Sequence, residues 1–236
     1  MREAIALAKN ALAIDPSYAP AAAMIGLCRV RQRMQGLGAV SEAEIAQAVL
    51  LARQAIEAGR DEPDALSMAG STISFLAGEH STAVGAADRA LALNPNSALA
   101  WSVRGWVLGW QNQPDSAIEA HQQAIRLSPL DPLAYSSTGG LAFAHMEAGR
   151  YEEAIEWADR TLHAQPRYIP AMRIKLVCLA YLGRTDDTND WLKRVLAVQP
   201  GLTIAAWKAS FASTVFSPEI LALYADGLRK AGVPEE

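Results

Sequence analysis

Prolines recur at a nearly constant interval between residues 95 and 200. Pro95, Pro129, Pro166 and Pro200 end the segments LALNP, IRLSP, LHAQP and LAVQP, and their separations are 129 − 95 = 34, 166 − 129 = 37 and 200 − 166 = 34 residues. Each proline closes a stretch with the apolar periodicity of an amphipathic helix. A period of this length predicts a stack of helical hairpins, because each hairpin then buries the apolar side of its neighbour.

Small residues follow the same period. Ala83, Ala117 and Ala154 each lie twelve positions before one of these prolines, and Ala90 and Ala124 lie five positions before. Where two helices cross closely only a small side chain fits, so the recurrence has a packing cause. Three further positions are expected in turns or at close helix contacts: Gly105, Gly149 and Gly183.

Two groups of residues resemble the tetratricopeptide repeat (TPR) family. Residues 148–156, AGRYEEAIE, resemble the turn between the two helices of a repeat and the start of its second helix. Five signature positions of the family are matched within one repeat, by Trp101, Gly105, Ala117, Ala124 and Pro129. The resemblance implies an all-α TPR-like α-solenoid, a right-handed superhelix of antiparallel helix pairs, and it is more specific for the fold than for the partner.

Some positions depart from that family. Ala142 stands where the family usually has glycine, and Thr161 and Thr188 stand where it usually has alanine. The repeats that contain these residues are expected to pack less ideally.

The chain is interpreted as a single TPR array over residues 1–236. We expect a partial repeat at 1–16, a divergent repeat with long helices at 17–62, four TPR-like repeats at 63–200 and a C-terminal capping helix pair at 201–236. Polarity on the outside of the cap would come from Asp226, Arg229 and Lys230, because the last hairpin of a solenoid has no neighbour to cover it.

Several helix boundaries are expected from local signals. A second-helix pattern covers Arg2 to Ile14, and long helices are expected from about Tyr18 to Gln35 and from Ser41 to about Ala58. Ser41 with Glu44 forms a capping box. Asp131-Pro132 and Ser217-Pro218 are predicted helix starts, with proline at the first helical position. After Pro200 a helix is expected through Trp207 and Phe211, and a last one to about Lys230.

Composition narrows the function classes. Hydrophobic residues make up 51% of the 236 residues, which is enough for a sizeable core, and a net charge of −4 gives no basic field for nucleic acid. Cys28 and Cys178 fit neither a disulfide framework nor a metal-ligand spacing, so we expect free thiols. No stretch reads as a signal peptide or a membrane span. We therefore expect a cytoplasmic protein that does not insert into membranes.

No set of residues predicts catalysis or cofactor binding. His80, His121, His145 and His163 do not converge with cysteines or carboxylates at a ligand spacing, and packing or surface roles are expected for them. The pair Gly139-Gly140 lacks the lysine and Ser/Thr of a phosphate-binding loop and is expected to permit close helix approach. The acidic run at Glu152 to Glu156 is read as a solvated helix start. We predict no catalytic residues, no cofactor and no metal.

The family resemblance predicts a peptide-binding groove on the inner face of the array, lined by the first helix of each pair. Its residues would be Met68, Thr72, Trp106, Trp110, Phe143, Met146, Arg173, Val177 and Tyr181. Aromatic anchors with one arginine suit an amphipathic helix or an extended peptide. The alternative is that these rings fill space between repeats. Chaperone adaptors that grip acidic C-terminal peptides carry lysine, asparagine and arginine at several groove positions. Here those positions hold Met68, Thr72, Ser102, Trp106, Ser136 and Gly140, so their carboxylate clamp is not present.

Two larger settings are compatible with the sequence. The ending ILALYADGLRKAGVPEE, with the repeats before it, resembles the C-terminal TPR regions of bacterial adenylate/guanylate cyclase-related signalling proteins. That resemblance implies a non-catalytic regulatory array whose catalytic domain lies upstream. The alternative function is homo-oligomerisation through the uncapped N-terminal helix, for example as a homodimer.

Overall fold

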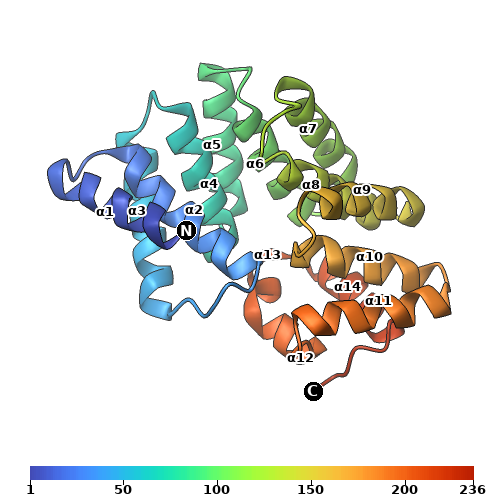
Figure 1. The fold of residues 1–236 in the computed structure, drawn as a ribbon. Helices are drawn as coiled ribbons and strands as arrows, with labels where there is room; N and C mark the ends of the chain where they lie inside the picture. Colours follow the sequence, from blue (N-terminus) through green and yellow to red (C-terminus); the bar gives the residue numbers. More distant parts are fainter. The chain divides into compact units, whose positions relative to one another are not determined.

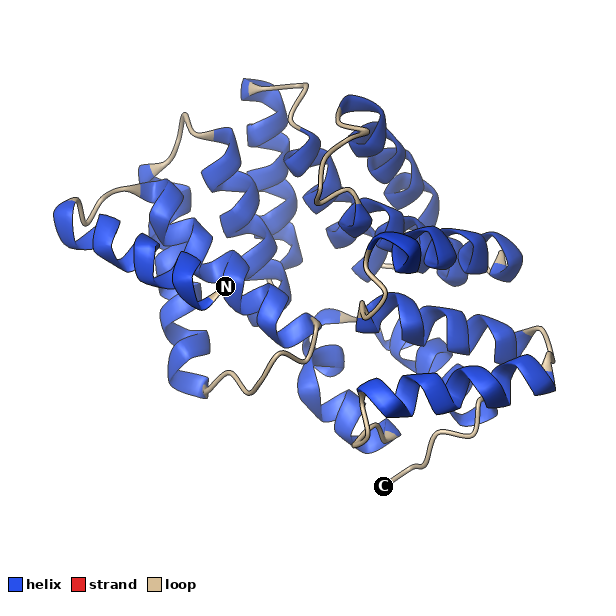
Figure 2. Ribbon diagram, viewed as in Figure 1, coloured by secondary structure: helices blue, strands red, loops and turns tan.

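The structure is a computed structural model of the 236 residues, and it describes the side chains of residues 1–210 and 214–236. Within these two ranges the chain is all-α and has no β-strand (Figure 2). The architecture is that of a TPR-like α-solenoid built from consecutive antiparallel helix pairs, as the spacing of prolines and alanines predicts. Figure 1 traces the helices in chain order.

The helices follow the expected order. One helix precedes the pairs, α1 (Arg2–Ile14). The five pairs are α2 (Ala19–Met34) with α3 (Glu42–Ala58), α4 (Pro63–Ala77) with α5 (His80–Leu93), α6 (Ala98–Trp110) with α7 (Pro114–Leu127), α8 (Tyr135–Glu147) with α9 (Tyr151–Ala164), and α10 (Ile169–Tyr181) with α11 (Thr185–Val198). The chain ends in α12 (Ile204–Trp207), η1 (Lys208–Ala212), α13 (Ser213–Val215) and α14 (Pro218–Lys230). Phe211, expected in one helix with Trp207, lies outside the described residues.

Two compact units are formed, by Met1–Val107 and by Leu108–Glu236. In the first, α2 packs on α3 and α4, and α4 packs on α5. In the second, α8 packs on α7 and α9, and α10 packs on α9, α11 and α14. The division between the units falls inside α6, and the single array over 1–236 stays a prediction.

The turns between paired helices share one backbone conformation. Gly78, Asn112, Gly149 and Gly183 all have positive φ, between 59° and 72°. Their separations are 112 − 78 = 34, 149 − 112 = 37 and 183 − 149 = 34, the same as those of the prolines. A left-handed residue after a helix end is normally glycine or asparagine, because other side chains meet the backbone there. The period is therefore carried by the turns as well as by the helices.

Helix starts agree with the local signals in two of three cases. Ser41 and Glu44 form the expected capping box, and the Ser217 hydroxyl accepts from the amide of Ile220 with Pro218 at the start of α14. The expectation of a helix start at Asp131-Pro132 is wrong. Asp131 accepts from the amide of Leu133 at 2.8 Å and makes a turn, so α8 begins at Tyr135 instead. An Asp side chain that caps its own turn competes with helix formation.

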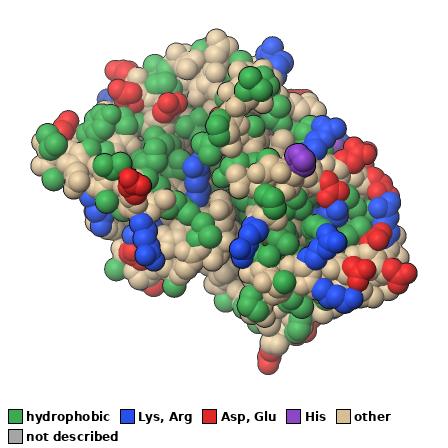
Figure 3. Space-filling view, in the orientation of Figure 1, with side chains coloured by type: hydrophobic (Ala, Val, Ile, Leu, Met, Phe, Trp, Pro, Cys, Tyr) green, Lys and Arg blue, Asp and Glu red, His purple; other side chains and the backbone are tan. Residues whose placement is uncertain are grey.

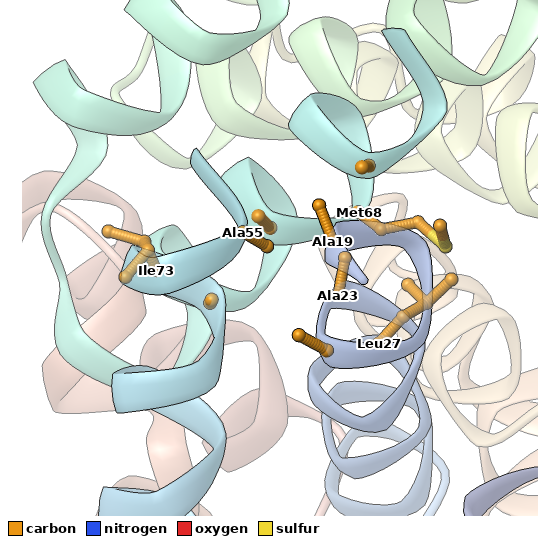
Figure 4. Packing of buried hydrophobic residues seen from close by; sticks show 10 residues of the cluster. Ala19, Ala23, Leu27, Ala55, Met68 and Ile73 are labelled. Carbon is orange, nitrogen blue, oxygen red and sulfur yellow. The ribbon is translucent and has the colours of Figure 1, made fainter. Parts of the chain in front are cut away.

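The cores depend on small residues at helix crossings. Ala83, Ala117 and Ala154, the alanines of the sequence period, are completely buried. In the first unit, alanines of α2, α3 and α4 pack around Leu27, Met68 and Ile73 (Figure 4). Because these alanines let the helices approach closely, each hairpin can cover its neighbour.

Ion pairs join neighbouring elements at the surface. Acidic and basic side chains are interspersed on the face shown in Figure 3. Arg104 pairs with Asp88 at 3.0 Å, Lys175 with Asp159 at 2.5 Å and Arg184 with Glu152 at 2.6 Å. Among the described residues, none of the helices has the length and hydropathy needed to span a membrane.

Candidate functional site

In the first unit the predicted groove residues are buried. Met68 and Trp106 are 6% and 8% exposed, and Thr72 is completely buried. Thr72 lies between α4 and α2, because a Cβ added at Gly26 would come 2.4 Å from its Oγ1. Its hydroxyl donates to the carbonyl of Met68, 2.9 Å away. Met68 and Thr72 thus pack between helices, and the peptide-binding groove stays a prediction.

In the second unit the predicted groove residues are also removed from solvent. Trp110, Phe143, Arg173 and Val177 are at most 4% exposed, Met146 is completely buried and Tyr181 is half-buried. Three of them, Arg173, Val177 and Tyr181, lie at intervals of four along α10 and thus on one side of it. What covers that side is the last helix of the chain itself.

Helix α14 lies against α10, as Figure 1 shows and as the contacts between the two helices confirm. The closest approach is at Gly227. A Cβ added there would lie 2.4 Å from Cγ1 of Val177 and 2.9 Å from Cε2 of Tyr181. Since Val177 is completely buried and β-branched, it has little freedom to move away. Only glycine fits at this point of α14.

Polar contacts fix the position of α14 along α10. The Tyr181 hydroxyl lies 2.7 Å from the carbonyl oxygen of Leu223 and 3.0 Å from Oδ2 of Asp226. Arg173 donates to the hydroxyl of Tyr224, and both side chains are buried. Burial raises the pKa of the Tyr224 phenol and lowers the pKa of Arg173. Hydrogen bonds between buried groups are directional, so they set the register of the two helices.

An aromatic cluster extends this contact to α8. Phe143 stacks on Phe216 with ring centroids 5.4 Å apart, and Trp207 stacks on Tyr224 at 4.8 Å. The backbone amide of Ser217 donates to the carbonyl of Trp110 at 3.2 Å. Phe216 and Ser217, which precede α14, thus contact Phe143 and Trp110, two residues that the sequence assigned to the groove.

Glu147 is a buried acid at the end of α8. Neither carboxylate oxygen has a hydrogen-bond partner in the part of the chain that the structure describes, and both oxygens are buried. Desolvation raises the pKa of Glu147 well above 4.5. The carboxylate lies close to Gly109 of α6, because a Cβ added at Gly109 would be 3.5 Å from Oε2. A buried acid without a partner favours the neutral form.

His80, His121 and Cys178 lie in packed or hydrogen-bonded surroundings. His121 is buried against Gly140, and burial lowers its pKa to about 3. His80 lies 2.7 Å from the Ser74 hydroxyl, and burial raises the pKa of the Cys178 thiol. Within residues 1–210 and 214–236, no group of three or more His, Cys, Asp or Glu is placed to hold a metal ion. The glycine pair acts in packing as expected, since Gly139 faces Tyr168 and Gly140 faces His121.

Sequence reasoning missed the residues of α14 that face the groove. Tyr224 and Gly227 were assigned to a terminal cap, with no partner named. One signal was present, because a glycine in the middle of an amphipathic helix lowers its stability and usually has a packing reason. The helix on which it packs could not be read from the sequence.

Comparisons with known proteins agree with this fold. Residues 104–169 match the tetratricopeptide repeat family. Small glutamine-rich tetratricopeptide repeat-containing protein 2 of Mycosarcoma maydis is 34% identical over 88 residues, which are 37% of this chain and 24% of that protein. The match thus spans about a quarter of the length of this curated relative.

Solved structures extend the likeness over most of the chain. PilW, a type IV pilus biogenesis factor, matches with a TM-score of 0.62 and 20% identity over 88% of this chain and 92% of its own. A chain of the APC/C hetero-tetramer Cut9–Hcn1 matches with a TM-score of 0.70 and 16% identity, over 91% of this chain and 39% of that chain. Identities this low show the fold alone. Residues 104–169 therefore resemble tetratricopeptide repeats, and the chain has the TPR-like α-solenoid fold.

Proposed function

We propose that this protein is a non-catalytic interaction scaffold that binds a peptide or helix on the first helices of its pairs. The observation that carries the proposal is the seat of α14 on α10, where a helix is bound by steric fit and by hydrogen bonds. Solenoids of this class present extended concave surfaces to other polypeptides. A chain of the Cut9–Hcn1 hetero-tetramer shares the fold and is itself part of an assembly.

The proposal is tested by mapping where a partner is captured. A photo-reactive side chain at Ser102, half-buried on α6 in the predicted groove register, is expected to cross-link a partner from the native cell extract. The same group at Glu119, exposed on the second helix α7, serves as the matched control. Equal capture at both positions, or capture at Glu119 alone, would contradict binding on the first helices.

Alanine substitution of Trp106 and Trp110 is a poor test of the same proposal. Both rings are buried, and removing a buried tryptophan costs roughly 3–5 kcal/mol of folding free energy. Loss of a partner in such a variant would report unfolding rather than a lost contact.

We also propose a place for the array within a larger protein, as the regulatory C-terminal part of a cyclase-related bacterial signalling protein. The support is the sequence resemblance of its repeats and of its last seventeen residues, from Ile220 to Glu236. An antibody raised against α14 should detect an endogenous protein much heavier than the 25.3 kDa of this chain. A single band at 25.3 kDa would contradict this part of the proposal.

Homo-oligomerisation through α1 is the second candidate function. Leu7 and Ile14 lie seven residues apart on α1, on one side of the helix, and are 63% and 88% exposed. Two exposed large side chains on one helix favour a contact with a second copy. Sedimentation velocity should then show a dimer for the natural chain and a monomer for Leu7→Glu. A monomer at all concentrations would exclude this candidate.

A further inference from the structure

We infer that the face of α10 formed by Arg173, Val177 and Tyr181 is a helix-binding site that α14 occupies in cis, and that a helix of another polypeptide with the pattern of α14 replaces it. This inference rests on the proposed scaffold function and specifies the ligand. The pattern is an aromatic residue with a hydroxyl group, a carboxylate two residues later and glycine in the next position, as in Tyr224, Asp226 and Gly227.

The steric part of the pattern comes from Val177. The backbone of α14 approaches so closely that one added carbon would lie 2.4 Å from Cγ1 of Val177. Any helix that docks at the same depth therefore needs glycine at the crossing. A helix with a larger residue there is kept at a distance and loses the polar contacts on either side.

The polar part comes from two residues of α10. Buried Arg173 donates to a phenol oxygen, here that of Tyr224. One turn beyond Val177, the Tyr181 hydroxyl reaches the carbonyl of Leu223 and the carboxylate of Asp226. A competing helix has to supply the same acceptors, because leaving a buried donor without an acceptor costs more than the bond itself contributes.

A buried acid lies one helical turn from the ring that stacks on the C-terminal segment. Phe143, one turn before Glu147 on α8, is stacked on Phe216 of the C-terminal segment. Glu147 lies buried, and its carboxylate has no hydrogen-bond partner among residues 1–210 and 214–236. A buried, unpaired carboxylate raises the free energy of the folded state.

The test measures binding of a labelled peptide with the sequence of residues 217–233 to the full chain. In the natural chain the tethered α14 competes for the site, so the peptide binds weakly. Gly227→Ala in the chain keeps α14 helical but prevents docking, and we expect the peptide to bind at least about tenfold more tightly, equivalent to 1.4 kcal/mol of lost cis docking. The matched control is Gly85→Ala, an exposed helical glycine with no atom within 4 Å of an added Cβ.

A second variant covers the case in which Gly227→Ala does not fold cooperatively. Asp226→Ala removes one contact of the Tyr181 hydroxyl at a partly exposed position and should also tighten peptide binding, relative to Asp190→Ala at an exposed ion pair. A peptide that itself carries Gly227→Ala should not bind to any of these chains.

Three results would overturn the inference. The first is equal peptide affinity for the natural chain and for both α14 variants. The second is undiminished binding of the Gly227→Ala peptide. The third is a natural dimer that the peptide dissociates, which would make a second copy the occupant. None of these results affects the capture experiment at Ser102, so the failure of this inference is distinguishable from failure of the scaffold function.

Discussion

At the scale of single residues, the fold keeps two buried titratable side chains in their neutral forms. The His121 ring is buried against Gly140, and burial keeps it neutral by lowering its pKa to about 3. Glu147 is buried with no hydrogen-bond partner in the described ranges, and burial raises its pKa. In both cases the uncharged form is the one that suits the folded state. Glu147 and the contact between His121 and Gly140 each lead to a prediction about stability.

Glu147→Gln should stabilise the protein at neutral pH. Because the folded-state pKa of Glu147 is raised, its proton is held more tightly in the folded form, and stability falls as the pH rises from about 4.5 through that raised pKa. Glutamine does not titrate, so the variant should gain on the order of 1–3 kcal/mol at neutral pH and little at pH 4.5.

Urea unfolding at several pH values measures this difference. Glu119→Gln, at an exposed position on α7, is the control and should follow the natural chain at every pH. Parallel curves for Glu147→Gln and the natural chain would show that Glu147 is solvated in the folded state.

Gly140→Ala should destabilise the second unit. The added Cβ would lie 2.1 Å from Nε2 of His121, whose ring is 1% exposed and cannot move into solvent without loss of packing. Overpacking of this kind costs roughly 1–3 kcal/mol. The double variant His121→Ala, Gly140→Ala should recover part of that loss, which a double-mutant cycle of unfolding free energies would detect. Strict additivity would mean that the two residues are not in contact.

At the scale of elements, the period of the chain is held by its turns as much as by its helices. Gly78, Asn112, Gly149 and Gly183 end the first helix of successive pairs in the left-handed conformation. These positions end one helix and start the next in a fixed direction, so the 34-residue spacing becomes a regular stack. Glycine stabilises these turns, whereas glycine inside a helix, such as Gly85 within α5, lowers the stability of that helix.

Alanine at these two kinds of glycine should therefore change stability with opposite signs. Gly149→Ala places a Cβ in the left-handed region at φ +72° and should cost about 1–2 kcal/mol, although no atom lies within 4 Å. Gly85→Ala in α5 should gain about 0.5–1 kcal/mol from helix propensity. Thermal unfolding followed by circular dichroism would measure both. A loss at Gly85 equal to that at Gly149 would refute the conformational argument.

At the scale of the whole molecule, most of the stability comes from the packing of apolar side chains, and surface ion pairs contribute little. Ion pairs such as Arg184 with Glu152 and Arg104 with Asp88 join neighbouring elements, but their side chains are between 30% and 55% exposed. Exposed pairs contribute about 0–1 kcal/mol each and are screened by salt. The packed alanines and ring stacks are not sensitive to screening.

Salt concentration should accordingly have a small effect on the stability of the fold. Raising NaCl from about 0.05 M to about 0.5 M is expected to change the free energy of unfolding by less than about 1 kcal/mol, since opposing like-charge repulsions are screened as well. Chemical denaturation at both salt concentrations tests this with the natural chain. A loss of several kcal/mol would show that the surface pairs act as a cooperative network.

The sequence alone was sufficient for the all-α class, for the helix pairs and for most of their boundaries. These features depend on local signals, namely the proline period, the alanines at crossings and the capping box of Ser41 with Glu44, and such signals act within one or two helices. The error at Asp131 is local too, because an Asx turn and an N-cap use the same residue type.

The tertiary structure decided what lies on the predicted groove residues. Arg173, Val177 and Tyr181 were identified from their register along α10. The helix that covers them lies far along the chain, since Asp226, which the Tyr181 hydroxyl contacts, is 45 residues from Tyr181. A contact across that separation depends on shape complementarity between Gly227 and Val177, and neither residue shows its partner in the sequence. Periodicity identifies the face of a helix that will be buried, whereas only the folded chain shows which segment buries it.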